Sequence, residues 1–291
     1  MAAPARGTPC FRLPPPQLPP RPDNPLARYW LHQGYTLLST VCTDWTGRDP
    51  VTRELQQNLT LWPGGMKSFA EYVHSKGMQL SVYTDAGTHN CCGEPGSLGF
   101  EDIDMKTFAE WGVDMAGVDY CGGPAVEVRE AYQRFADAIA KSGRNFQLGT
   151  WNLGRGRAWE WGPSMSESMI AASAGQPGIW TGAFLPHMRL TGDIGNKWGG
   201  TQTGPTMTVI STVDEIQSIQ DLWDYGMGNV SGTYPNYGQM VVGVPKDHPT
   251  LGDVGLTLVE AQSHFSIANC NTNANCFELS IENAEIVENY P

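Results

Sequence analysis

The feature that most constrains the fold of this chain is an alternation of strand-like runs with amphipathic helical runs between residues 33 and 267. Such alternation is typical of βα units, which build a parallel sheet covered by helices. The predicted strands are residues 34–42, 78–87, 113–121, 144–152, 187–194 and 238–244. The predicted helices are residues 64–77, 101–112, 124–143 and 213–226, and a further helix begins within residues 256–267.

This pattern predicts the α/β class and a TIM-type (β/α)8 barrel. A closed barrel of this type has eight strands, so the first and last strands are not recognisable and are expected in the two divergent ends. At 291 residues and 40% hydrophobic content, the chain can bury the core of one such domain. We predict three segments: a Pro-rich, disordered stretch at residues 1–30, a catalytic barrel at 31–268, and a divergent tail at 269–291.

Composition excludes several classes of partner. The net charge of −12 provides no basic stripe for binding phosphates, which argues against nucleic acid. No apolar run approaches the ~18 residues that a membrane span requires. Ten Trp and ten Tyr residues fit a protein that stacks aromatic faces on sugar rings, although Trp residues are equally at home in a core. The sequence does not specify an oligomeric state.

Cysteine and histidine spacing predicts no metal site and no cofactor. The six His are scattered, and the adjacent pair Cys91-Cys92 does not form a CxxC motif. Seven cysteines leave at least one unpaired if the others pair. Two glycosylation sequons begin at Asn58 and Asn229, and they are meaningful only in a secretory compartment. The N-terminus lacks the continuous apolar core of a signal peptide.

Two aspartates close predicted strands. Asp119 ends residues 113–121, and Asp193 ends residues 187–194. In an α/β barrel the carboxyl ends of the strands meet at one mouth, where such barrels carry out their chemistry. Two carboxylates that face one bond are what glycoside hydrolysis needs, since one attacks the anomeric carbon and the other carries the proton. The pair therefore predicts a retaining glycosidase.

The chain resembles glycoside hydrolase family 27, the α-galactosidases or melibiases. The resemblance runs from WPGGMKSFAEYVHSKGMQLSVYTDAG through PGSLGFEDIDMKTFAEWGVD to Asp119 and Cys121. It resumes at RLTGDI and at GLTLVEAQSHFSI, and it covers about residues 34–267. It implies a barrel fold, an oligosaccharide or glycoside substrate, a secreted or secretory-pathway protein, and a reaction that needs no cofactor.

The resemblance also assigns roles to individual residues. Asp119 corresponds to the nucleophile, Asp193 to the general acid/base, and Arg189 to an arginine that contacts the substrate. Cys91 and Cys121 correspond to a disulfide near the nucleophile. Asp85, in the motif YTDAG, is expected to have a structural role.

Sugar recognition departs from the family pattern. Galactose-specific relatives end their second strand with two aspartates before a Trp, where this chain has only Asp44 before Trp45. They carry a Lys two residues before the nucleophile, where this chain has Gly117. We expect Asp44 and Trp45 to contact the substrate and Trp151 to form an apolar wall of the pocket, with core packing as the alternative for Trp151.

These departures predict a sugar specificity shifted from galactose. A site built to bond a hydroxyl group rejects sugars that lack it, so the loss of such groups changes the preferred sugar. Arabinopyranosides and α-glucans are alternatives to α-galactosides. Two other readings remain open: an inactive or binding-only relative that recognises carbohydrate, and a barrel enzyme of another class.

Overall fold

The structure is a computed structural model that describes part of the chain. The described residues are 35–40, 44–122, 126–172, 187–189, 191–192, 211, 214, 234–236, 247–248, 252–253 and 277–280. Within them, no helix is long and apolar enough to cross a membrane.

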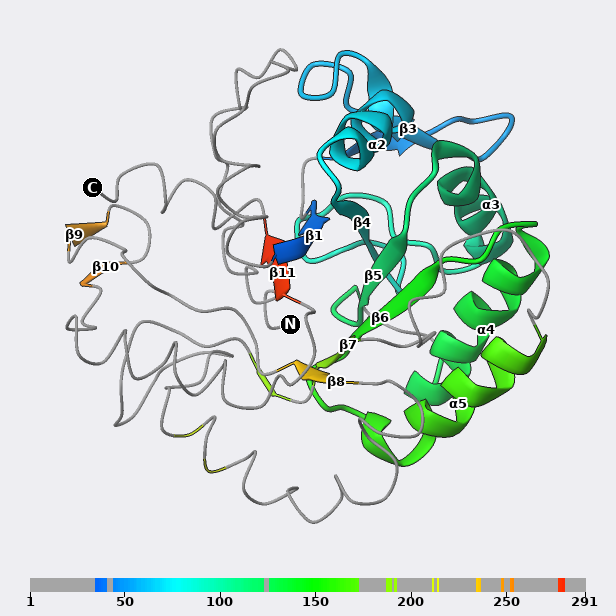
Figure 1. The fold of residues 1–291 in the computed structure, drawn as a ribbon, viewed down its shortest axis with the longest axis vertical. Coiled ribbons are helices and arrows are strands. Elements are labelled where there is room, and N and C mark those ends of the chain that lie inside the picture. Colours follow the sequence, from blue (N-terminus) through cyan, green and yellow to red (C-terminus); the bar gives the residue numbers. More distant parts are fainter. Residues whose placement is uncertain are drawn as a thin grey trace, which may run out of the picture.

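A curled parallel sheet forms the centre of the fold (Figure 1). Its strand order is β11-β1-β4-β5-β6-β7-β8, and every neighbouring pair is parallel. The strands are β1 (Tyr35–Ser39), β4 (Gln79–Asp85), β5 (Met115–Asp119), β6 (Gln147–Trp151), β7 (His187–Arg189), β8 (Tyr234–Asn236) and β11 (Phe277–Ser280). Because successive strands lie side by side and the sheet curls, the described part is a half-barrel of the TIM type, which confirms the predicted fold class.

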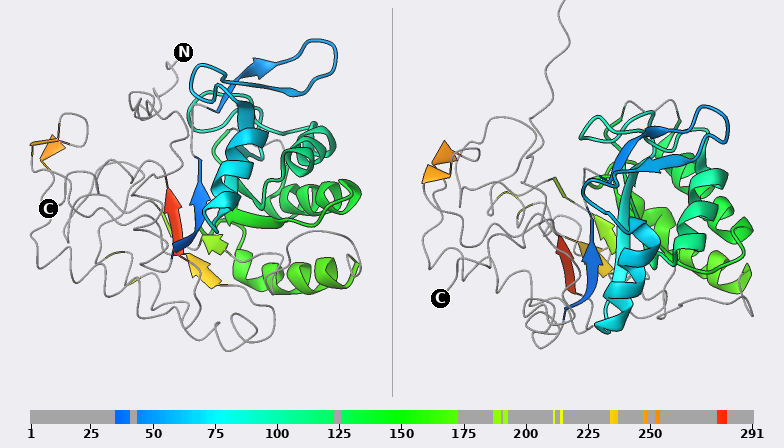
Figure 2. Two further views of the ribbon diagram at one scale, coloured as in Figure 1. Left: turned by 45° about the horizontal axis from the view of Figure 1, so that its top comes forward. Right: turned by 90° about the horizontal axis from the view of Figure 1, so that it is seen from above.

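The four helices of the described part cover the outer face of this sheet (Figures 1 and 2). They are α2 (Gly65–Ser75), α3 (Glu101–Trp111), α4 (Val128–Lys141) and α5 (Ala158–Ala172). Local sequence explains their ends. Helix α3 begins with three acidic residues, which suit the positive end of the helix dipole, and ends at Gly112 in the left-handed conformation. Glu127 caps α4 by accepting the backbone N–H groups of Arg129 and Glu130.

Buried side chains form two clusters, one on each face of the sheet. The large outer cluster lies between strands and helices and includes Leu80, Val118 and Phe135, all fully buried. The small inner cluster consists of Leu37, Tyr83, Met115 and Trp151. Side chains on a strand alternate between its two faces, so Asp119, four residues after Met115, belongs to the inner face. That face is the interior of the barrel.

Several elements differ from the sequence expectation. Residues 158–172 form α5 although Pro163 interrupts the helical pattern, and this helix was not predicted. The antiparallel hairpin of β2 (Trp45–Arg48) and β3 (Leu55–Gln57) was also missed; it lies at the end of the sheet to which the strands point (Figure 2). Strand β11 lies within residues 269–291, the divergent end in which an unrecognised outer strand is expected.

Three predicted elements, namely the strand at residues 238–244, the helix at 256–267, and almost all of the helix at 213–226, lie outside the described residues. A small antiparallel pair, β9 (Asp247–His248) and β10 (Gly252–Asp253), completes the described elements.

Candidate active site

Three functional side chains stand in one row at the carboxyl ends of neighbouring strands. Asp119 pairs in register with Asp85 on β4 and with Trp151 on β6. All three positions point to the same face because directly paired residues of parallel strands share a side of the sheet. The row therefore lies at the mouth of the barrel, on its inner side, where the sequence predicts the active site.

Two hydrogen bonds fix the carboxylate of Asp119. The Tyr83 hydroxyl donates to Oδ2 at 2.9 Å, and the backbone N–H of Tyr120 donates to Oδ1 at 2.7 Å. Burial raises the pKa of Asp119 most and the neighbouring Asp85 adds to this, whereas the two hydrogen bonds and Arg189 lower it; together they give a pKa of about 6. The carboxylate is thus held in one orientation and is ionised above about pH 6.

Arg189 lies at the end of β7, two strands from Asp119. It is 7% exposed, and its positive charge favours the ionised form of Asp119. Met188 pairs with Thr150, so Arg189 stands level with Trp151 on the inner face. The structure therefore brings Arg189 to the same site as Asp119. Asp193, the predicted acid/base, lies outside the described residues.

Trp151 lies beside Asp119 on the inner face of the sheet. Its ring stacks on Tyr83 with centroids 5.6 Å apart. Two atoms of its six-membered ring lie 2.6 and 2.7 Å from the place that a Cβ on Gly117 would occupy. Only a glycine leaves room for this ring on β5. The indole Nε1 is buried and has no hydrogen-bond partner among the described residues.

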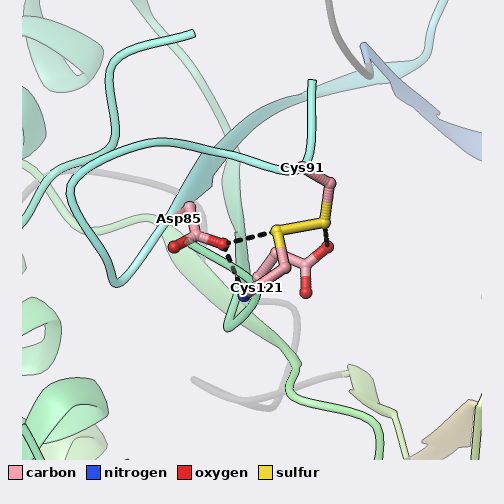
Figure 3. A group of neighbouring side chains, drawn as sticks. Asp85, Cys91 and Cys121 are labelled. Carbon is pink, nitrogen blue, oxygen red and sulfur yellow. Dashed lines mark hydrogen bonds between the residues drawn. A yellow bond between two sulfur atoms is a disulfide. The ribbon is translucent and has the colours of Figure 1, made fainter. Parts of the chain in front are cut away.

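A disulfide joins Cys91 to Cys121 beside this row, as the sequence predicted (Figure 3). Cys121 Sγ lies 3.1 Å from Oδ2 of Asp85, and Cys91 Sγ lies 3.4 Å from Oδ2 of Asp119. The bond ties the loop after β4 to the residue that follows Tyr120. It therefore braces the backbone just after Asp119.

Asp85 organises the backbone around the disulfide. Its carboxylate is fully buried and accepts the N–H groups of Gly87, Gly122 and Cys121. Burial raises the pKa of Asp85, and these three donors lower it. Because its carboxylate holds three backbone N–H groups, Asp85 acts as a structural residue, as expected for the YTDAG motif.

Asp44 and Trp45 have positions that differ from the substrate contacts expected of them. Asp44 is fully buried and accepts a hydrogen bond from the Thr40 hydroxyl at 2.6 Å; burial raises its pKa well above the usual value. Trp45 packs in the outer cluster, where its ring stacks on Phe108 and Trp111 of α3. Neither residue is therefore assigned to the proposed site.

The described residues contain one group of side chains that could hold a metal ion: Asp85, Cys91, Asp119 and Cys121. One potential ligand atom from each lies within 4.8 Å of the others. While the two sulfurs are bonded to each other, the group offers no thiolate.

This chain is similar to several known proteins. The family model described as alpha galactosidase A matches residues 25–159. An alpha-galactosidase of Oryza sativa subsp. japonica is 32% identical over 211 residues, which are 72% of this chain and 40% of that protein. Alpha-galactosidase A of Cellvibrio japonicus is 37% identical over 124 residues, which are 43% of this chain and 31% of that protein. Part of this chain is a relative of the family 27 glycoside hydrolases.

A solved structure supports the fold of this family 27 relative. Alpha-galactosidase I from Mortierella vinacea superposes with a TM-score of 0.66 at 21% identity, covering 84% of this chain and 58% of that one. The chain spans less than half the length of the two curated relatives above.

Sequence reasoning missed one residue of this site. Tyr83 donates directly to the carboxylate of Asp119 and stacks on Trp151. The sequence pattern predicts only that Tyr83 belongs to a strand. Its place two residues before Asp85 was the available signal, since positions two apart on a strand share a face.

Proposed function

We propose that this protein is a retaining glycoside hydrolase of the α-galactosidase type, which hydrolyses terminal α-linked sugars by double displacement. The observation that carries the proposal is Asp119 itself. Its carboxylate stands at the carboxyl end of a barrel strand, is oriented by Tyr83 and Tyr120, and has Arg189 on the same face. The similarity to alpha-galactosidases supports the same assignment.

In the first displacement, an oxygen of the ionised Asp119 attacks the anomeric carbon. The bond from that carbon to the leaving-group oxygen breaks, and Asp193 gives its proton to the departing oxygen. In the second displacement, water attacks the same carbon and passes a proton to Asp193, while the bond to Asp119 breaks. Two inversions at one carbon give net retention. The cycle returns both carboxyl groups to their starting protonation states.

Tyr83 and Arg189 prepare Asp119 for attack. The hydroxyl of Tyr83 occupies one lone pair of Oδ2 and so limits the directions from which that oxygen can react. Arg189 contributes positive charge that holds the carboxylate ionised although burial opposes it. We also assign to Arg189 a hydrogen bond to a sugar hydroxyl group, which its donors can make from the inner face.

Trp151 and Gly117 support a specificity shifted from galactose. Where galactose-specific relatives carry a Lys, this chain has Gly117, and the ring of Trp151 fills the space above it. An aromatic face stacks on the C–H surface of a sugar but cannot replace the hydrogen bonds of an ammonium group. We propose that Trp151 forms the apolar wall of the sugar site, with its indole N–H available to a hydroxyl group.

The second candidate is a relative that binds carbohydrate without hydrolysing it. The positions of Asp44 and Trp45 favour it, because neither residue is placed to hold sugar hydroxyl groups. The carboxylate of Asp119, oriented by Tyr83 and Tyr120 at the end of β5, supports the enzyme. Turnover separates the two candidates directly.

The test is a panel of nitrophenyl glycosides: α-galactoside, α-N-acetylgalactosaminide, β-L-arabinopyranoside and α-glucoside. We expect one of them to be hydrolysed by the wild type and not by Asp119→Asn. Asp137→Asn is the matched control, since it makes the same change at an exposed position on α4. Equal turnover by Asp119→Asn and the wild type would rule out Asp119 as the nucleophile.

Azide rescue tests directly whether Asp119 is the nucleophile. In Asp119→Gly, azide can occupy the vacated space and attack the anomeric carbon as nitrophenolate leaves. We expect azide to restore release of nitrophenolate, with a glycosyl azide of inverted configuration as the product. If the product forms with retained configuration, another group is the nucleophile. Binding of the glycoside without turnover in either protein would support the binding-only candidate.

A further inference from the structure

We propose that the disulfide Cys91–Cys121 conceals a binding site for a thiophilic divalent cation, which opens when the disulfide is reduced. Its ligands are the two thiolates and the carboxylates of Asp85 and Asp119. Figure 3 labels Asp85 and the two bonded cysteines. A mixed sulfur and oxygen set of four suits Zn²⁺, and Cd²⁺ is the corresponding spectroscopic probe. The blocking of activity described below rests on the proposed function, whereas the binding site does not.

The four side chains have the spacing that the ion requires. Zn²⁺ binds sulfur and carboxylate oxygen at distances that place the ligands of a tetrahedron about 3.3–3.8 Å apart. Cys121 Sγ already lies 3.1 Å from Asp85 Oδ2, and Cys91 Sγ lies 3.4 Å from Asp119 Oδ2. All four ligand atoms fall within 4.8 Å of one another. Opening the sulfur–sulfur bond is the main rearrangement needed.

In the oxidised form, each sulfur of the disulfide faces a carboxylate oxygen. A disulfide sulfur carries no proton, so each sulfur meets a carboxylate oxygen as one lone-pair-bearing atom against another. A cation placed between them would attract all four. It would also offset the charge of Asp85 and Asp119, which lie close enough for Asp85 to raise the pKa of Asp119.

Groups other than the disulfide hold the ligands in place. Asp85 is fixed by three backbone N–H groups, and Asp119 by Tyr83 and Tyr120. Hydrogen bonds of this kind to ligating carboxylates are typical of metal sites. The loop that carries Cys91 is closed by the side chain of Asn90, which accepts the N–H groups of Cys92 and Glu94. The cluster therefore does not depend on the disulfide alone.

Reductants can reach the bond, because the side chains of Cys91 and Cys121 are both exposed. A dithiol such as dithiothreitol supplies two electrons and two protons: the Cys91–Cys121 bond breaks, two S–H bonds form, and the reductant closes to its own disulfide. Each thiol then releases its proton as its sulfur binds the cation. Because Asp119 is one of the ligands, the bound ion would occupy the proposed nucleophile.

The test is a Cd²⁺ titration of the whole chain after reduction and anaerobic removal of the dithiol, followed by the thiolate-to-cadmium charge-transfer absorption. The variant Cys91→Ser/Cys121→Ser keeps the other five of the seven cysteines and is the matched control. We expect reduced wild type to bind one Cd²⁺ more than this variant, and oxidised wild type to lack that site. Asp119→Asn should weaken binding at this site tenfold or more. Zn²⁺ should displace the probe.

Equal Cd²⁺ stoichiometry in the reduced wild type and the double variant would overturn the proposal. The proposal would also be overturned if oxidation left the Cd²⁺ stoichiometry of the wild type unchanged. A reduced protein that loses its near-ultraviolet circular dichroism and binds no additional Cd²⁺ would overturn it as well. In the activity arm, Zn²⁺ should block glycoside hydrolysis by the reduced protein and leave the oxidised protein unaffected. If no glycoside is hydrolysed, the proposed function fails while the Cd²⁺ stoichiometry still decides the site.

Discussion

Tyr83 and Asp119 are joined by a hydrogen bond of 2.9 Å across the β4–β5 pair, from the phenolic hydroxyl to Oδ2. The bond links a member of the small inner cluster to the carboxylate to which we assign the attack on the sugar. It also favours the ionised form of Asp119, against the burial that raises the pKa of this group.

Replacing Tyr83 by Phe should raise the pKa of Asp119. The variant keeps the ring that stacks on Trp151 and removes only the donor to the carboxylate. We expect the acidic limb of the pH dependence of kcat/KM to move above its wild-type position near pH 6, and kcat/KM to fall by roughly tenfold or more. Tyr120→Phe is the control, since its hydroxyl donates to a backbone carbonyl. An acidic limb that stays in place would contradict the role of Tyr83.

Asp119→Asn should stabilise the protein at neutral pH while it removes turnover. Burial raises the pKa of Asp119 above its unfolded value near 4, so ionisation opposes folding. This destabilisation is absent below about pH 4, grows as the pH rises towards 6, and is complete above that. The variant avoids it and should gain on the order of 2 kcal/mol at pH 7 and little at pH 4. Urea unfolding at both pH values measures the difference. A variant less stable than the wild type at pH 7 would contradict this prediction.

Gly117→Ala should displace Trp151. The added Cβ would stand 2.6 Å from an atom of the indole ring, which is closer than two carbon atoms can approach. We expect a loss of about 1–3 kcal/mol in the free energy of unfolding and a raised KM for the preferred glycoside. Gly47→Ala is the control, since its nearest contact would be an ordinary 3.4 Å. Unchanged KM and stability would show that the ring moves away freely.

Asp85→Asn should destabilise the mouth of the barrel. An amide cannot accept all three backbone N–H groups that the carboxylate accepts, and it places a donor against one of them. We expect a loss of about 1–3 kcal/mol, seen as a lower urea midpoint. Removing this negative charge should also lower the pKa of Asp119, so the acidic limb of kcat/KM should move to lower pH. A variant of normal stability would argue against the structural role.

The sequence predicted the parallel βα organisation and the place of Asp119. Apolar runs such as residues 113–121 mark strands that are buried on both faces, and helical spacing marks the segments that cover them. These are local properties, so they can be read without knowing what each segment touches. Helix α5 was missed because Pro163 breaks the local helical pattern. Packing against the neighbouring elements determines which of its side chains are buried.

The positions of Asp44, Trp45 and Trp151 could not be read in this way. Each lies at or beside the end of a strand, and the local pattern does not say which side of the sheet the side chain of such a residue enters. Trp45 packs outward against α3, whereas Trp151 lies inward over Gly117. The difference depends on side chains that are distant in sequence. The role of Asp193 as general acid/base remains a prediction, since this residue lies outside the described part.

The sequence by itself therefore determined the barrel class, the candidate nucleophile and, through resemblance, the Cys91–Cys121 pairing. Only the tertiary structure brought Asp85, Cys91, Asp119 and Cys121 within 4.8 Å of one another. The spacing of these residues along the chain matches no metal motif, because their proximity comes from two adjacent strand ends and the loop that folds over them. Strand pairing joins segments by hydrogen bonds between backbones, and so it creates neighbours that no local pattern records.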